Sequence, residues 1–141
     1  ANLERGARYF EGEIKASRSQ RSFYLSAARS YLFNLNLAEA VNNGKWLCDI
    51  IGGPLYGDQQ DGVVPISPAE KVHLEANLSL AKGIHKNRLK LERRNYCIVP
   101  TSMCWQQEGD MLSLSFDLPT GIFATSLLAE FLNYRVLLGE A

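Results

Sequence analysis

The part of the chain that most restricts its fold is the segment 111–133, MLSLSFDLPTGIFATSLLAEFLN. Its first half alternates apolar and polar residues, which is typical of a strand with one buried face. Pro119 and Gly121 then end the strand. Thr125 or Ser126 is in place to cap the helix that follows. Since a strand that turns through a Pro-Gly corner into a helix needs other segments to cover it, we expect an α+β fold.

The size and composition of the chain limit its class. Its 141 residues are enough for one domain or for two small pieces of something larger. The apolar runs are far shorter than the roughly 18 residues of a membrane-spanning helix, and no secretory signal is visible. Three cysteines without paired spacing favour free thiols in a reducing compartment. We therefore expect a cytoplasmic protein with no membrane contact.

The net charge of zero hides an uneven distribution. Residues 1–94 carry 14 Lys and Arg against 10 Asp and Glu, a net of +4, whereas residues 95–141 carry a net of −4. We expect any contact with a polyanion to be made by the first 94 residues. Ordinary solvated surface charge explains the same count equally well.

Helical periodicity and capping signals divide the first 94 residues. Segments 15–21 and 52–65 are polar or rich in glycine and proline, and they are expected to be loops. Ser67 and Glu70 form a capping box, with Pro68 at the first helical position. The expected helices are residues 2–14, residues 23–41 after a Ser22 cap, residues 68–81 and, beyond Gly83, residues 84–94.

Short β-prone runs fill most of the rest. A short strand is expected over 45–51 and another over 95–99. Residues 102–107 and 111–118 are expected to form an antiparallel hairpin across 108–110. The closing helix is expected over 125–134.

Most site chemistries are missing from the sequence. His73 and His85 are not accompanied by Cys or carboxylate residues at metal-ligand spacing, which argues against a metal site. The phosphate-binding and dinucleotide-binding glycine motifs are also absent. We expect neither a metal nor a cofactor.

Basic residues are the more suggestive feature. Arg18 and Arg21 in the first loop, together with basic residues of 82–94, are placed to form a phosphate-binding surface. The alternative is an ordinary polar helix face. Arg29 lies within an apolar helix and is equally well explained as an arginine whose stem is buried and whose head reaches solvent. The members of segment 82–94 that we include as candidates are Lys86, Arg93 and Arg94.

Two motifs carry a family resemblance. Residues 21–34, RSFYLSAARSYLFN, closely resemble the R-S-F-x-L-S-A-A-R-S-x-L-F-N segment of the TruD family of tRNA pseudouridine synthases. Residues 118–133, LPTGIFATSLLAEFLN, resemble that family's C-terminal L-P-x-G-x-[FY]-A-T-S-x-x-R-E-x-x-N signature. The segment 92–100, ERRNYCIVP, is similar to the region before the family's hairpin. The resemblance is weak over 45–89.

The resemblance implies a function and an incomplete catalytic site. Family members convert a uridine in the D arm of tRNA to pseudouridine without a cofactor. Their catalytic aspartate lies in a G-x-K-D-K-x-A motif, and an N-Y-F-G-x-Q-R-F-G motif helps to hold the base, but neither motif occurs here. The expected partners are therefore tRNA and either a missing N-terminal segment or a second chain that supplies the aspartate.

The family also implies a division of the chain. Residues 1–94 are expected to form part of the inserted, mostly helical domain, and residues 95–141 to complete the sheet of the catalytic domain with a hairpin and a C-terminal helix. A stretch of the insertion is expected to be missing near Gly52.

By motif match, the turn of Phe123, Ala124, Thr125 and Ser126 is expected near the uridine pocket. Arg21, Arg29 and Asn34 are expected at the junction of the two domains. Alternatively, the turn is only a helix cap and Arg29 is only an ion-pair partner. Ala129 stands where the family has arginine, which leaves a catalytically inactive RNA-binding homologue or fragment as the second hypothesis.

Overall fold

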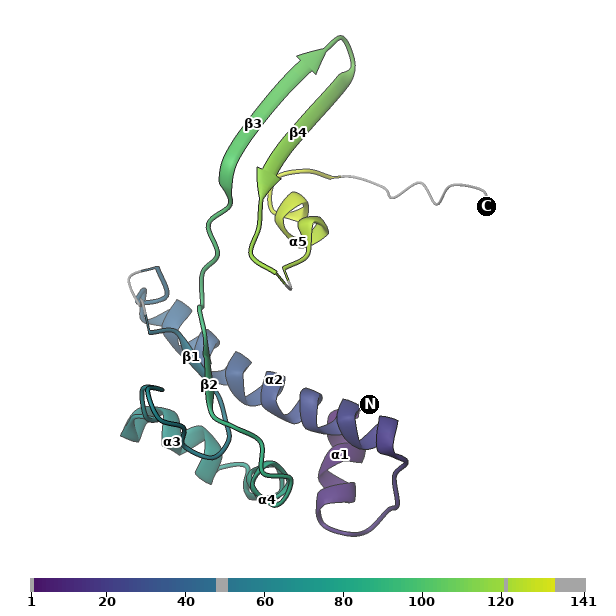
Figure 1. Cartoon of the computed structure of the whole chain (residues 1–141), viewed down its shortest axis with the longest axis vertical. Helices are drawn as coiled ribbons and strands as arrows, with labels where there is room; N and C mark the ends of the chain where they lie inside the picture. The colour runs from purple at the N-terminus through teal and green to yellow at the C-terminus, as the bar shows by residue number, and fades with distance from the viewer. Residues whose placement is uncertain (1, 48–50, 121, 134–141) are drawn as a thin grey trace. The chain divides into compact units, whose positions relative to one another are not determined.

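The computed structural model describes residues 2–47, 51–120 and 122–133. They fall into two compact units, Ala1–Cys97 and Ile98–Ala141. Helices and antiparallel strand pairs occur together, so the expected α+β class is confirmed. Figure 1 labels the elements in chain order.

The first unit is organised around the long helix α2 (Arg18–Asn42). The Ser17 side chain accepts a hydrogen bond from the Gln20 amide, and the Gln20 side chain accepts one from the Ser17 amide. This reciprocal capping box begins the helix inside segment 15–21. The expected loop over that whole segment, and the expected Ser22 cap, are therefore wrong.

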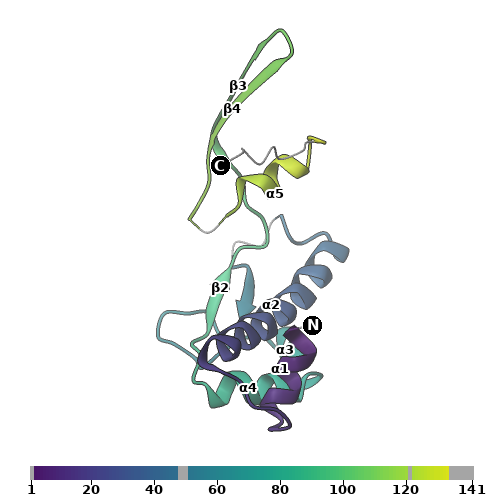
Figure 2. The ribbon, with the colours of Figure 1, turned by 90° about the vertical axis from the view of Figure 1, so that its right-hand side faces the viewer.

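Three shorter helices contact α2 and enclose the core of the unit. They are α1 (Asn2–Phe10), α3 (Pro68–Glu75) and α4 (Leu78–Lys86). Figure 2 shows α1 and α4 beside α2 from a second direction. The most buried cluster consists of Ala28, Leu32, Tyr56, Leu80 and Ile84.

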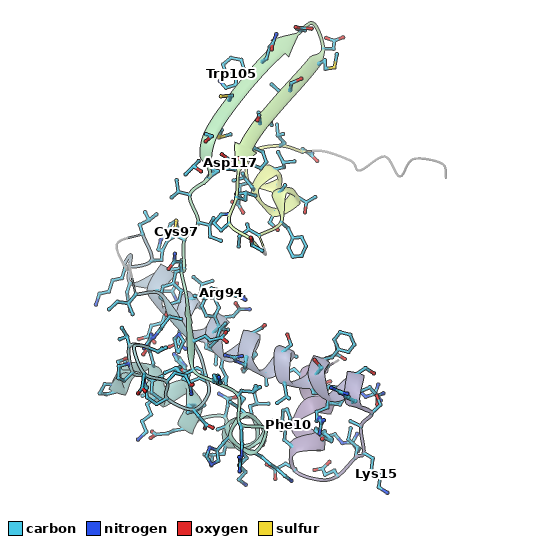
Figure 3. The ribbon with its side chains drawn as sticks, viewed as in Figure 1. Phe10, Lys15, Arg94, Cys97, Trp105 and Asp117 are labelled. Atoms are coloured by element: carbon cyan, nitrogen blue, oxygen red, sulfur yellow. The ribbon has the colours of Figure 1, made fainter. Side chains whose placement is uncertain are left out.

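The capping box at Ser67 and Glu70 is present as predicted, but the break between the next two helices is not at Gly83. The chain leaves the helix at Ala76 and Asn77, and Gly83 lies inside α4. A Cβ atom at Gly83 would lie 2.3 Å from the ring of Phe10. Glycine is therefore needed there for the close packing of α1 on α4 rather than for a turn, and Figure 3 labels Phe10 at this contact.

A two-stranded antiparallel sheet joins distant parts of the first unit. Strand β1 (Gly53–Leu55) pairs with β2 (Glu92–Arg94), with Pro54 opposite Arg93. The expected loop over 52–65 thus contains a strand. The expected helix over 84–94 ends at Lys86, because Arg88 has a left-handed φ of 50° and turns the chain into the extended segment.

Two other predicted strands do not occur in the described residues. Segment 95–99 contains no strand, although it was expected to be one. Of the expected strand over 45–51, residues 48–50 lie outside the described residues, and the described part forms no strand.

The second unit contains the predicted hairpin and a short helix. Strand β3 (Thr101–Glu108) pairs with β4 (Met111–Asp117), and Gly109 supplies the left-handed φ of 58° in the turn. The apolar face of β4 was expected to be buried, but Leu112 is 46% exposed and the following apolar residues are only half-buried. The alternation is present, but the described residues cover the apolar face only in part.

Helix α5 (Ala124–Ala129) is shorter than the expected helix over 125–134. Phe123 occupies the N-cap position and makes no side-chain capping bond. Thr125 and Ser126 lie within the helix, so neither is the cap that was expected. Residue 134, the expected end of the helix, lies outside the described residues.

Candidate functional site

A pocket of about 510 Å³ opens between α1, α4 and the beginning of α2. We call it the basic pocket. Three of its lining side chains are cationic and none is acidic. Its lining residues are Tyr9, Phe10, Gly12, Ile14, Lys15, Ala16, Arg21, Gly83, Lys86 and Asn87.

Local structure explains why distant residues meet here. Gly12, with a φ of 83°, ends α1 and accommodates a sharp change of direction. The Ser17 capping box then begins α2 a few residues later, which brings Lys15 and Arg21 to the same pocket. Lys86 arrives from the last turn of α4, which the contact between Phe10 and Gly83 holds against α1.

The three cations of the basic pocket, Lys15, Arg21 and Lys86, are exposed, and none of them forms an ion pair with a residue that the structure describes. The ring of Tyr9 lies 5.6 Å from that of Phe10 and 5.9 Å from that of Tyr24, measured between centroids. The pocket therefore combines uncompensated positive charge with an aromatic wall. Of its members, the sequence interpretation singled out Arg21 and Lys86. It missed the aromatic residues because their spacing is that of an ordinary helix face.

Arg29 is held inside the first unit. Its Nη2 atom donates to the carbonyl oxygens of Leu55 at 2.9 Å and Lys90 at 2.8 Å, and it lies 3.7 Å from a Glu92 carboxylate oxygen. Burial lowers the pKa of the Arg29 guanidinium from its ordinary value, while the nearby Glu92 charge acts in the opposite direction. These contacts connect α2 to the sheet of β1 and β2 and to Lys90 beside it.

Arg93 is more completely engaged. Its guanidinium forms an ion pair with the Glu70 carboxylate, and both side chains are about 15% exposed or less. It also donates to the carbonyl oxygens of Gly52, Val64 and Pro65. All of these partners lie in the first unit, so the side chain that was a candidate for phosphate contact is occupied by contacts within the fold.

The remaining basic candidates are more accessible. Arg94 is exposed, and its guanidinium carbon lies 5.7 Å from the centroid of the Phe33 ring. This distance is within the range of a cation–π contact. Arg18 is exposed in the first turn of α2 and does not line the basic pocket.

The residues of the second motif lie in the second unit. Phe123 is 74% exposed, and Thr125 and Ser126 are exposed at the start of α5. Ala129, at the end of the same helix, is also exposed. These side chains are accessible to a ligand.

Within residues 2–47, 51–120 and 122–133, no group of three or more His, Cys, Asp or Glu side chains is placed to hold a metal ion. Over the same residues, no helix has the length and apolar character needed to cross a membrane.

Comparison with known proteins identifies relatives of the chain. The chain is 30% identical over 170 residues to the tRNA pseudouridine synthase D of Hydrogenovibrio crunogenus, which covers 96% of the chain and 49% of that protein. It is 34% identical over 149 residues to the protein of the same name from Photobacterium profundum, covering 82% of the chain and 42% of the relative. The Aliivibrio fischeri protein is 29% identical over 94% of the chain and 47% of its own length. No family model matches the chain.

These matches give the class first: the chain is similar to proteins that are named pseudouridine synthases. Within that class, the resemblance to the TruD family that both motifs carry is confirmed. The chain spans about half the length of the curated relatives it matches.

The alignments also differ in length from the chain. Since 96% of 141 residues is about 135, an alignment of 170 positions to the Hydrogenovibrio protein leaves about 35 positions without a counterpart in the chain. The Hydrogenovibrio protein therefore has about 35 positions within the aligned region that the chain lacks.

Proposed function

We propose that this chain is the C-terminal portion of a tRNA pseudouridine synthase and that it supplies RNA-binding surface and scaffold for the isomerisation of uridine to pseudouridine. The observation that carries the proposal is the match to proteins named tRNA pseudouridine synthase D over nearly the whole chain. The two motifs support it, because both occur in the order found in the family.

The catalytic aspartate is supplied from outside this chain. The family's G-x-K-D-K-x-A motif does not occur in the sequence, and the relatives are about twice as long as the matched stretch. A missing N-terminal segment, or a second chain, provides the aspartate in this account. The substrate uridine is taken out of its stack before the reaction, as in other enzymes that modify a base within structured nucleic acid.

The division of labour within the chain follows the family. Residues 1–94 belong to the inserted domain, and part of the insertion is missing near Gly52. Residues 95–141 complete the sheet of the catalytic domain. Two observations support this: Leu112 on the apolar side of β4 is 46% exposed, and Trp105 on β3 is 70% exposed. Both are explained if further strands pack there in the complete domain.

In this proposal the turn of Phe123, Thr125 and Ser126 faces the uridine pocket, and the exposure of all three residues is compatible with that role. Arg21, Lys86, Arg18 and Arg94 contact RNA. Arg29 and Arg93 act through the fold, because the Arg29 Nη2 atom donates to two backbone carbonyl oxygens and the Arg93 guanidinium is bound by carbonyl oxygens and the Glu70 carboxylate. Cytoplasmic location, where tRNA is modified, is part of the same proposal.

Release of tritium from tRNA labelled at carbon 5 of uridine tests this function. We expect no release from the 141-residue chain alone, and release when a segment carrying G-x-K-D-K-x-A is added. Salt-sensitive tRNA binding without release under either condition would instead establish the second candidate, an inactive RNA-binding homologue. Ala129 in place of the family arginine is the observation that favours this alternative. No tRNA binding at low salt would contradict both.

A further inference from the structure

We infer that the basic pocket is a binding subsite for the phosphodiester backbone of RNA, with Lys15, Arg21 and Lys86 as its phosphate contacts. The inference rests on the proposed function, because it names the surface through which the first unit holds its RNA. It adds Lys15, which lies outside both family motifs, and places it in one pocket with Arg21 and Lys86.

The first argument is the contrast between two kinds of basic residue in the same unit. Arg29 and Arg93 are largely buried. The Nη2 atom of Arg29 contacts carbonyl oxygens and Glu92, and the Arg93 guanidinium contacts carbonyl oxygens and Glu70. The three cations of the basic pocket have no such partner among the described residues, and no acidic side chain lines the pocket. Like charges gathered without compensation raise the local potential and attract a polyanion.

The second argument is shape. A volume of about 510 Å³ lies in the range of about 300–1,000 Å³ typical of ligand pockets. A flat solvated helix face would offer no such concavity. The cations come from three separate parts of the chain, the loop before α2, the first turns of α2 and the last turn of α4, so a bound group can be contacted from several directions.

The third argument selects RNA among polyanions. Tyr9 and Phe10 line the same pocket, and each is half-buried. Sites for unpaired nucleic acid combine cationic side chains that follow the backbone with aromatic rings that contact bases. Arginine is also suited to phosphate, because its planar guanidinium contacts two oxygens at once. An acidic peptide would use the charge but not the rings.

The test measures binding of a fluorescent tRNA transcript to the full chain by anisotropy over a series of salt concentrations. The test variant carries Lys15→Ala, Arg21→Ala and Lys86→Ala. The control carries Arg5→Ala, Lys45→Ala and Lys90→Ala, which removes the same charge from exposed side chains that do not line the pocket. Circular dichroism establishes that both variants are folded.

We expect the test variant to bind at least tenfold more weakly at low salt and to lower the slope of log K against log salt by about 2–3, since each lost phosphate contact lowers it by roughly 0.7–0.9. The control variant should lower the slope by less than about 1. Equal loss in both variants would overturn the subsite, because net charge alone would then explain binding. So would displacement of the transcript by poly-glutamate at equal charge concentration, which would indicate an acidic protein partner.

Failure of this subsite is distinguishable from failure of the proposed function. If the variants behave alike while tritium is still released in the completed enzyme, only the subsite is wrong. If the test variant alone loses binding and no tritium is ever released, the subsite stands and the catalytic proposal is wrong.

Discussion

Replacing Arg93 with alanine is the perturbation that bears most directly on the packing of the first unit. The Arg93 side chain is 13% exposed and that of its partner Glu70 is 15% exposed. The guanidinium joins β2 to the first turn of α3, to the segment between β1 and α3, and to Gly52 just before β1. Besides both Glu70 carboxylate oxygens, its acceptors are the carbonyl oxygens of Gly52, Val64 and Pro65.

The size of the effect follows from what Arg93→Ala leaves behind. Removing one partner of a buried ion pair costs about 3–5 kcal/mol, because the other charge stays buried without compensation. Water has some access to Glu70, so we expect the lower end, about 3 kcal/mol. Since a domain of this size has a free energy of unfolding of about 5–15 kcal/mol, the loss would be a large fraction of the total.

The assay is urea unfolding followed by the helical circular dichroism signal, because the long helices belong to the first unit. The matched control is Arg94→Ala, which removes an exposed arginine and a cation–π contact worth about 0.5–1 kcal/mol. Glu70→Gln keeps the capping box while it removes the charge. A double-mutant cycle of Arg93→Ala with Glu70→Gln should give a coupling energy of about 1–3 kcal/mol. A loss for Arg93→Ala no larger than that for Arg94→Ala would refute the role of this ion pair.

Three further substitutions test other parts of the structure. Tyr56→Phe should cost about 1–3 kcal/mol, because it deprives the part-buried Glu70 carbonyl oxygen of the hydroxyl that donates to it. Burial raises the pKa of the Tyr56 hydroxyl. The stabilisation by this hydroxyl is therefore fully present below about pH 10 and is lost as the pH rises further and the unfolded chain ionises. Unfolding curves at several pH values should show that the difference in free energy of unfolding between wild type and variant shrinks above that pH, and a constant difference would contradict this. Gly83→Ala should lower the free energy of unfolding by about 1–3 kcal/mol despite the higher helix propensity of alanine, since the new Cβ would meet the Phe10 ring. An increase in the thermal midpoint of unfolding would disprove this contact. Trp105→Lys should change the free energy of unfolding of this chain by less than about 0.5 kcal/mol, because the side chain is 70% exposed, and should reduce binding of a hydrophobic dye; a large destabilisation would show that Trp105 is covered.

The sequence predicted the features that depend on neighbouring residues. The box at Ser67 and Glu70 and the hairpin turn at Gly109 were both expected and both occur. Each is decided within a few residues by hydrogen bonding or backbone conformation. The α+β class followed from the same local patterns.

Features that depend on distant partners were missed. Gly83 carries the same local signal as a helix-ending glycine, but the ring of Phe10 decides its role. Residues Glu92–Arg94 become a strand because β1 pairs with them, although their basic, polar sequence continues a helix pattern. Tertiary pairing overrode local preference in both cases.

The candidate site shows the same limit. The basic character of Arg21 and Lys86 was visible in the sequence, whereas their meeting in one pocket depends on how α1 packs between α2 and α4. Arg93 was expected to contact phosphate, but it pairs with Glu70. No sequence pattern reveals this pairing.

The most direct test of the central claim is made in the cells that encode this chain. Its coding region is deleted, and pseudouridine in the D arm of purified tRNA is mapped by primer extension after carbodiimide treatment. We predict that the D-arm pseudouridine is lost, that pseudouridines elsewhere in tRNA remain, and that the intact gene restores the lost one. Unchanged pseudouridine in the D arm after the deletion would contradict a role for this chain in that modification.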